Sequence, residues 1–300
     1  MGEELPRAGD AAATGARPGG AWGSVLSCAE LAAVGGVGFA PVGQVFGAAV
    51  YAAGAASASG CPGTAGAAGR GEPEGFGPLV EAMYQARRTA LDRMTAECAA
   101  LGGHGVVGLR LSRTPFIFGE LEFTAIGTAV RAAGAPAGPR VPFACGLSGQ
   151  DFARLVKAGW VPAGLALGIA IGARHDDRVT TRQARPWSGN AEMAGWTALV
   201  NETRQRARRR LEDDVRRLGA DGVVIAGMGM RVRQRDCPEA VGRRDHIVEV
   251  TFTGTGIASF SGRPVSGPVL AVMPLGTWPR QAASPPQGKI LVIQNGRWFL

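Results

Sequence analysis

Side chains that could bind a metal ion are concentrated in one short stretch, RDCPEAVGRRDHIVEV, which spans residues 235–250. Cys237 and His246 are separated by a turn-forming sequence, and Asp245 is one of several carboxylates beside them. A thiol, an imidazole and a carboxylate are ligands that a soft divalent ion accepts. Cys237, Asp245 and His246 are therefore the candidate metal ligands. The favoured interpretation of this stretch is a solvated loop in which arginines balance the acidic residues.

A second imidazole lies in the sequence His175-Asp176-Asp177, which follows a strand-like run. His175 could contribute to the same metal site. Short polar residues directly after a strand are nevertheless typical of turns. We expect these three residues to form a surface turn.

The sequence contains no motif of a known catalytic site: the G-x-S-x-G elbow, the Walker loop and H-E-x-x-H are all missing. Glu122 and Glu249 are carboxylates at matching positions ahead of a Gly-Thr pair. A buried carboxylate on a strand can pair with an arginine at a module boundary, such as Arg87 or Arg204. We expect that structural role rather than acid/base chemistry, and predict a protein without enzymatic activity.

The elements that would position these residues occur twice along the chain. LSCAELAAVGGVGFAPVGQVFG at 26–47 aligns without a gap with LSGQDFARLVKAGWVPAGLALG at 147–168. Each begins with a serine followed three residues later by an acid, which predicts a capped helix start. Each then passes through a Gly/Pro turn into a β-rich run. A repeat of this length indicates two similar structural units.

A long amphipathic helix follows in each half. Apolar residues recur at steps of three and four over 79–101 and 196–218, which predicts one buried face. Gly102 and Gly219 are expected to cap the C-terminal ends of these helices. An alternating run closes each half, EFTAIGTAV and EVTFTGTGI. The connection before it is expected to be longer in the second half (229–248) than in the first (112–121).

His104 and Cys98 form another conceivable metal pair, which the comparison between the halves argues against. ALGGHGVV aligns with RLGADGVV, so His104 takes the place of Asp221, and Cys98 takes the place of Val215. Histidine and aspartate both tolerate turn conformations. A cysteine that replaces a valine on an apolar stripe is most simply a small core residue. We interpret His104 as a turn residue.

These patterns predict an α+β fold of two tandem βαββ modules, each an antiparallel sheet covered by one long helix. The expected segments are a disordered N-terminal tail (1–23), module 1 (24–131), a linker (132–143), module 2 (144–258) and an extended Pro/Gly-rich C-terminal tail (259–300). Within that tail, PVLAVM or ILVIQ could add a strand.

The motifs resemble those of the YbjQ-like family, often labelled a "putative heavy-metal-binding domain". The resemblance rests on A-R-x-x-A-L-x-R-M at 86–94, L-G-x-x-x-V-V-G-[LV]-R at 101–110 and E-[FV]-x-x-x-G-T-A-V at 122–130. The second half matches less fully and departs from the pattern at Ile225-Ala226-Gly227. The resemblance implies a YbjQ/dodecin-like unit that assembles into rings. It thus implies a non-enzymatic, self-assembling binding or scaffold protein, whose cofactor, if any, is a soft divalent metal ion.

The formal net charge of +8 leaves an Arg-rich nucleic-acid or anionic-ligand binding protein as the alternative function. Seven arginines lie between 204 and 217, but acids at a spacing of four, as in Arg208 and Glu212, neutralise that helix face. No aromatic residue is interleaved with them for base stacking. Nucleic acid is therefore not the expected partner.

Cysteine usage and hydropathy favour a cytoplasmic location. The chain has five cysteines without a C-x-x-C pair, which suits a reducing compartment. The N-terminus has charged residues where a signal peptide needs an apolar segment. The uncharged run from 31 to 69 is interrupted by glycines, Pro41 and Gln44, so we predict no membrane span.

Overall fold

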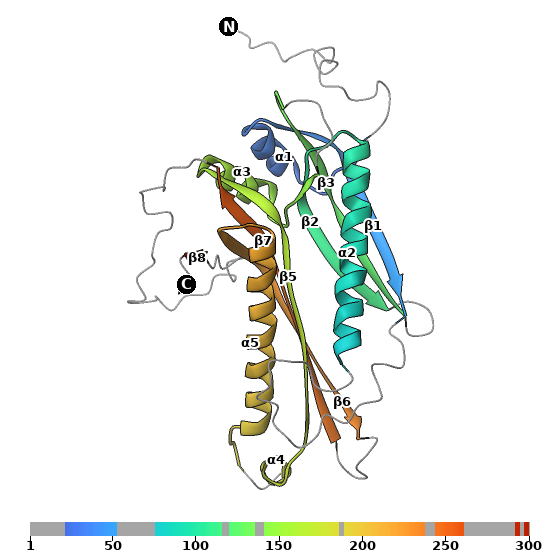
Figure 1. Cartoon of the computed structure of the whole chain (residues 1–300), viewed down its shortest axis with the longest axis vertical. Coiled ribbons are helices and arrows are strands. Elements are labelled where there is room, and N and C mark those ends of the chain that lie inside the picture. Colours follow the sequence, from blue (N-terminus) through green and yellow to red (C-terminus); the bar gives the residue numbers. More distant parts are fainter. Residues whose placement is uncertain are drawn as a thin grey trace.

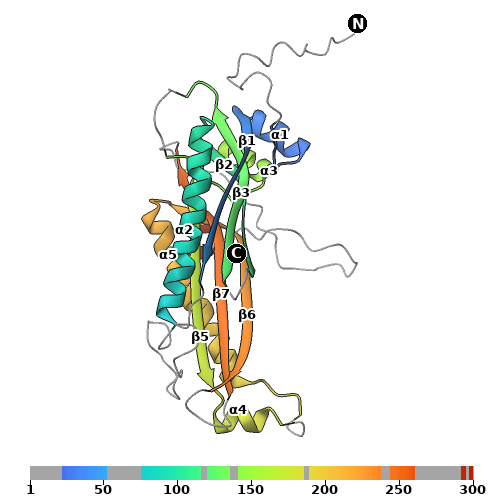
Figure 2. The same cartoon turned by 90° about the vertical axis from the view of Figure 1, so that its right-hand side faces the viewer.

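The computed structural model describes residues 22–52, 76–115, 120–135, 141–185, 189–237, 244–260, 292–294 and 297–299. Over these residues the chain has an α+β fold with two long helices, each packed on one antiparallel sheet (Figures 1 and 2). Nearly all of both predicted tails, including PVLAVM, lies outside them. Part of ILVIQ forms β8 (Val292–Gln294), which pairs with β9 (Arg297–Phe299). No helix among the described residues is long and apolar enough to cross a membrane.

Module 1 contains β1 (Phe39–Tyr51), α2 (Gly77–Ala100), β2 (Gly105–Pro115) and β3 (Leu121–Ala132), preceded by α1 (Cys28–Gly35). The strands are antiparallel in the order β1-β3-β2, and β4 (Phe143–Ala144) joins β2 in parallel. The predicted capping box starts α1, because the Ser27 side chain accepts from the Glu30 amide while Glu30 accepts from the Ser27 amide. Gly102 ends α2 with a φ of 70°, as a C-terminal cap requires.

Module 2 repeats this order with β5 (Trp160–His175), α5 (Ala194–Arg217), β6 (Gly222–Asp236) and β7 (Arg244–Ser259), preceded by α3 (Gly149–Lys157). A short helix, α4 (Arg178–Gln183), is added between β5 and α5. The strand order is β5-β7-β6, again antiparallel. The predicted fold class of two βαββ modules is confirmed.

Each long helix packs closely on its sheet at a glycine. A Cβ on Gly47 would lie 2.0 Å from the Ala90 carbonyl oxygen of α2, and one on Gly168 would lie 2.1 Å from the Ala207 carbonyl oxygen of α5. The predicted apolar stripes face these strands, with Met94 and Leu211 fully buried. Cys98 is also fully buried, which confirms that it is a core residue.

Side chains of the long helices also bond to the outer edges of the sheets. Glu97 of α2 accepts from the Phe46 amide at 2.6 Å, and Asp214 of α5 accepts from the Leu167 amide at 2.8 Å. Arg93 donates to the Ala48 carbonyl, and Arg210 donates to the carbonyl of the matching residue of β5, Ile169. Backbone amides and carbonyls at the outer edges of β1 and β5 therefore bond to helix side chains, and the arrangement is the same in both modules.

The expected loop at 229–248 is mostly strand, and this part of the prediction is wrong. β6 continues to Asp236, and β7 begins at Arg244, so the two strands pair as one long hairpin. Arginines at alternate positions, such as Arg231 and Arg233, lie on the exposed edge strand β6, where charged residues are tolerated. Because these residues are charged, the sequence lacks the run of apolar residues from which a strand is predicted. The extension places the predicted metal ligands at the far end of the sheet, near α4 (Figure 1).

The two modules pack against each other along β5. Leu165, Leu167, Ile169 and Ile171 share one buried core with residues of α2. The Ile169 amide donates to the Tyr84 hydroxyl of α2 at 2.9 Å. Module 2 therefore has helices of both modules against its first strand: α5 on one face and α2 on the other.

The first residues of module 2, before α3, also join the modules. Cys145 donates its amide to the Val106 carbonyl of β2 and accepts from the Leu109 amide. One residue further on, the Gly146 amide donates to the buried Thr255 hydroxyl of β7 at 3.0 Å. Residues 145–146, which we call the leader of module 2, are thus hydrogen-bonded to the sheets of both modules.

Candidate metal centre

Three potential ligands meet where β5, β6 and β7 end together. His175 is the last residue of β5, Asp245 lies opposite it near the start of β7, and Cys237 directly follows β6. Their ligand atoms all lie within 4.8 Å of one another. All three residues are buried, with exposed fractions of 4% for His175, 0% for Asp245 and 8% for Cys237.

His175 lies between the other two side chains and contacts both. His175 Nδ1 contacts Asp245 Oδ1, and His175 Nε2 lies 3.8 Å from Cys237 Sγ. The other carboxylate oxygen of Asp245 accepts from Arg235 Nε at 3.2 Å. The order is therefore guanidinium, carboxylate, imidazole and thiol.

His246, the third predicted ligand, lies elsewhere. Its Nε2 is 2.9 Å from Asp176 Oδ1, and its ring centroid is 4.6 Å from that of Trp196. Successive residues of a strand point to opposite faces of the sheet, so His246 and Asp245 cannot share one site on β7. The structure brings Cys237 and Asp245 together and pairs them with His175 instead.

The expectation of a surface turn at 175–177 is wrong for its first residue. His175 is paired with Asp245 in the register of the sheet and is almost fully buried. Asp177 does begin a helix: it caps α4 by accepting from the Thr180 amide, and this bond is the main reason that its pKa is lowered to about 2. The sequence signal for His175 was its place at the end of an apolar strand.

The donor set fits a soft or borderline ion. A thiolate and an imidazole are the usual protein ligands of zinc and related metals, and carboxylates can join them. A carboxylate bonded to the second ring nitrogen of a histidine ligand is a common support in such sites. His175 Nδ1 and Asp245 Oδ1 are placed in that way, with the thiol of Cys237 on the other side of the ring.

His104 makes a structural contact at the turn that follows α2. Its Nδ1 accepts from the Ala132 amide at 3.1 Å, and in module 2 the Asp221 carboxylate accepts from the Ser259 amide at 2.9 Å. Both side chains thus hold the end of the last strand to the turn that follows the long helix. The interpretation of His104 as a turn residue is confirmed.

Glu249 pairs with an arginine of the other module, but with a different one from those expected. Its Oε1 lies 2.8 Å from Arg113 of β2, and both side chains are nearly buried. The expected Arg87 donates instead to the Met83 carbonyl, and Arg204 contacts Met230 Sδ. Burial and the nearby Arg113 charge lower the pKa of Arg87 to about 10.

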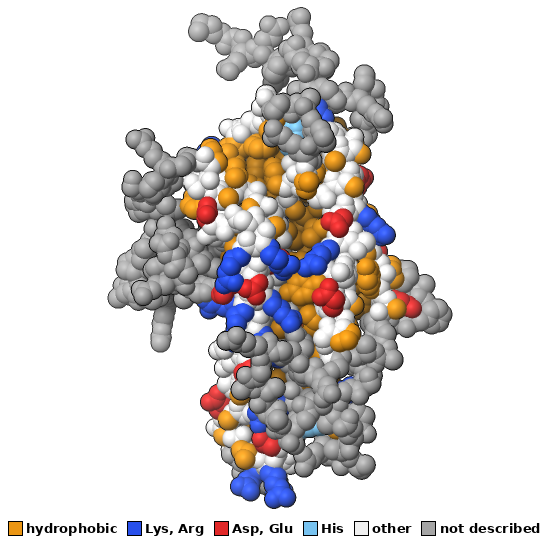
Figure 3. Space-filling view, in the orientation of Figure 1, with side chains coloured by type: hydrophobic (Ala, Val, Ile, Leu, Met, Phe, Trp, Pro, Cys, Tyr) orange, Lys and Arg blue, Asp and Glu red, His pale blue; other side chains and the backbone are white. Residues whose placement is uncertain are grey.

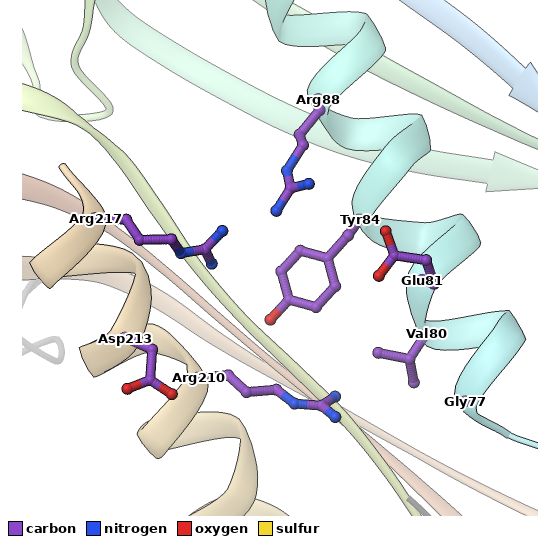
Figure 4. Close-up of a pocket in the computed structure, with 8 residues that line it drawn as sticks. All are labelled: Gly77, Val80, Glu81, Tyr84, Arg88, Arg210, Asp213 and Arg217. Atoms are coloured by element: carbon purple, nitrogen blue, oxygen red, sulfur yellow. The ribbon is translucent and has the colours of Figure 1, made fainter.

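A cavity of about 310 Å³ lies between α2 and α5. In Figure 4, Arg88 and Arg217 extend from the two helices toward the ring of Tyr84. The cavity is lined by Gly77, Val80, Glu81, Tyr84, Arg88, Arg210, Asp213 and Arg217. Burial raises the pKa of Tyr84, whose hydroxyl already accepts from β5. The polar groups of this cavity connect the two modules.

The arginines of α5 are largely engaged within the chain. Arg206 and Arg210 donate to carbonyls of β5, while Arg208, Arg216 and Arg217 pair with Glu212, Asp213 and Asp214. Figure 3 shows basic and acidic side chains mixed in a belt across the middle of this face. Such a mixed surface does not form the continuous basic patch that nucleic-acid binding uses.

Comparison with known proteins places the fold in a family. Residues 42–133 match the family model YbjQ, described as "Putative heavy-metal-binding". Over 61 residues the chain is 39% identical to UPF0145 proteins of Vibrio campbellii and Thermotoga maritima, covering 20% of this chain and 56% and 55% of those relatives. It is 37% identical over 209 residues to the "Encapsulin nanocompartment protein Rv1762c" of Mycobacterium tuberculosis, covering 67% of this chain and 75% of that protein. The chain therefore belongs to one family with Rv1762c, and its residues 42–133 form a YbjQ-like domain.

The candidate metal centre lies outside the part of the chain that matches the YbjQ model. Cys237, His175 and Asp245 are all in module 2, whereas the matched residues 42–133 cover module 1. The family description alone therefore does not assign a metal to these three residues.

Proposed function

We propose that this YbjQ-like protein is a cytoplasmic, self-assembling scaffold or binding protein without enzymatic activity, and that its two modules arose by duplication. The observation that carries the proposal is that the two modules contact each other asymmetrically. Module 1 contributes α2 and the edge of β2, whereas module 2 contributes the outer face of β5 and its first residues. Two of the surfaces used in these contacts have a counterpart on the other module that is not covered in the same way.

The first open surface is the outer face of β1. In β5 the matching face, including Leu167 and Ile171, is buried beneath α2. In β1 the corresponding residues, Phe46 and Val50, are 48% and 47% exposed. Exposed apolar side chains that are adjacent on a strand face are typical of an interface.

The second open surface is the edge of β6, with which no described strand pairs, although β8 contacts β6 within the chain. The leader of module 2 bonds to β2 at Val106 and Leu109, and in the alignment of the halves Val106 matches Val223 of β6. The leader of module 1 is already placed like that of module 2, because the Val25 amide donates to Thr128 Oγ1 at 3.0 Å, as Gly146 does to Thr255. In a second copy, this leader could therefore meet β6 of the first.

Contacts of this kind are heterologous, since one surface meets a different surface of the next copy. A repeated heterologous contact generates a closed ring or an open filament. The description of the relative Rv1762c as an encapsulin nanocompartment protein supports a closed assembly. We therefore propose a homo-oligomer in which module 2 of one chain packs on module 1 of the next.

Light scattering after size exclusion tests this proposal. The wild-type chain is expected to be an oligomer at micromolar concentration, and Val50→Glu is expected to shift it to a monomer because a carboxylate would be buried in the contact. Val179→Glu is the matched control, since Val179 is exposed on α4, away from both open surfaces. A monomeric wild type, or an oligomer unaffected by Val50→Glu, would contradict the proposal.

Binding of a soft divalent metal ion is a second candidate function. The observation that favours it is the meeting of Cys237, His175 and Asp245 in one buried group. Elemental analysis after loading with zinc or cadmium and desalting is expected to give one ion per chain. A protein that retains no ion would rule this function out and leave the self-assembly proposal untouched.

A further inference from the structure

We infer that Cys237 and His175 bind the ion directly, and that Asp245 is a positioning residue that holds the imidazole. This inference rests on the second candidate function and assigns roles within that site. The ligand is a soft or borderline divalent ion such as zinc or cadmium.

The separation of the two donors supports direct binding by both. Zinc binds a thiolate sulfur at about 2.3 Å and an imidazole nitrogen at about 2.0 Å, so two such donors at a tetrahedral ion lie roughly 3.5 Å apart. Cys237 Sγ and His175 Nε2 are 3.8 Å apart. A shift of a few tenths of an ångström would bring both donors to one ion.

The contacts of Asp245 favour a supporting role over direct binding. One carboxylate oxygen contacts His175 Nδ1, and the other accepts from Arg235. Each oxygen therefore faces a side-chain nitrogen of the chain. Contact with Nδ1 favours the tautomer in which that nitrogen carries the proton, so that Nε2 is the nitrogen left to bind a metal.

The surroundings also suit a cation. The site combines one carboxylate, which Arg235 contacts, with a thiol that becomes negative when a metal displaces its proton. The donors are buried on the sheet end beside α4, which limits competition from water. With two protein donors, the remaining positions on the ion would be open to water or to a small ligand.

Titration of the full chain with cobalt or cadmium tests the assignment. Wild-type protein is expected to bind one equivalent and to show the ultraviolet charge-transfer band of a metal thiolate. Cys237→Ser is expected to lose the band, and His175→Gln is expected to lose binding. Asp245→Asn should keep the band and weaken affinity about 10- to 100-fold, the usual effect of removing a group that supports a ligand.

His246→Gln is the matched control, because His246 is also a buried histidine that contacts an aspartate, Asp176, outside the proposed site. It is expected to leave the affinity unchanged within about twofold. Metal binding that survives Cys237→Ser, or that shows no thiolate band, would overturn the inference while metal binding itself stood. Binding abolished by Asp245→Asn with the band lost would make Asp245 a direct ligand and would also overturn it.

A second measurement uses unaltered protein, in case the variants do not fold. Cadmium is expected to protect Cys237 from alkylation in peptide mapping, while the exposed Cys28 reacts at the same rate with and without the ion. Equal alkylation of Cys237 under both conditions, at a saturating cadmium concentration, would overturn the inference.

Discussion

Two carboxylates on the long helices hold the outer edges of the sheets. Asp214 accepts from the Leu167 amide, and Glu97 accepts from the Phe46 amide at the matching position of module 1. A hydrogen bond to a charged group contributes about 1.5–3 kcal/mol, more than a neutral one, and its loss leaves a partly buried amide unsatisfied. Single residues of the helix thus determine whether the strand edge is protected.

Asp214→Ala is therefore expected to lower the free energy of unfolding by about 1.5–3 kcal/mol. Asp213→Ala is the control, because Asp213 is exposed, its carboxylate pairs with Arg216 of the same helix, and the substitution makes the same change in helix propensity. Its expected effect is within about 0.5 kcal/mol. Urea unfolding followed by circular dichroism measures both, and equal losses would show that the edge contact contributes nothing.

At this scale the sequence predicted some residues well and others poorly. Alignment of the halves identified His104 as a turn residue, and Asp221 makes the matching hydrogen bond in module 2. It predicted Cys237 and Asp245 as potential ligands, but it chose His246, the nearer histidine along the chain. His175 is 62 residues from Cys237, and only the register of β5 on β7 brings it close.

Among the elements, the first strand and the long helix of each module form the most constrained pair. Gly47 and Gly168 sit where the helix backbone approaches the strand, so neither position has room for a side chain. Glycine weakens a strand through its entropy, but here it permits close packing of helix on sheet. The close approach of helix to sheet therefore depends on glycine at these positions.

Gly168→Ala is expected to destabilise the fold by about 1–3 kcal/mol or more, because the added methyl group would overlap the Ala207 carbonyl. Gly227→Ala is the matched control: it lies on β6, and an added Cβ there would have nothing within 4 Å. That variant is expected to be neutral or slightly more stable. Thermal unfolding compares them, and a neutral Gly168→Ala would mean that the helix shifts at little cost.

Most elements could be predicted from the sequence because their patterns are periodic and repeated. The long helices, the first strands and the last strands lie where the two aligned halves place them. The end of the β6–β7 hairpin could not be predicted, since it has no counterpart in module 1 and is rich in arginine. A strand at a sheet edge does not need apolar residues on both faces, so its pattern is weak.

The arrangement of the two modules is a property of the whole molecule that the aligned halves do not reveal. Similar modules could pack symmetrically, but α2 lies on β5 while the matching face of β1 is open. Glu249 and Arg113 secure this contact as a nearly buried pair 2.8 Å apart. Arg87 adds a second guanidinium near them, since Glu249 raises its pKa and Arg113 lowers it.

Glu249→Gln is therefore expected to weaken the contact between the modules, so that they no longer unfold together. It leaves Arg113 without the negative charge in a site shared with Arg87, and breaking a buried pair from one side costs about 3–5 kcal/mol. Unfolding in urea is expected to change from one transition to two, with the contact between modules lost first. Glu122→Gln is the control, because Glu122 is the matching residue of module 1 and accepts from the Thr114 hydroxyl of its own sheet. A single, equally stable transition in both variants would show that apolar packing along β5 alone holds the modules together.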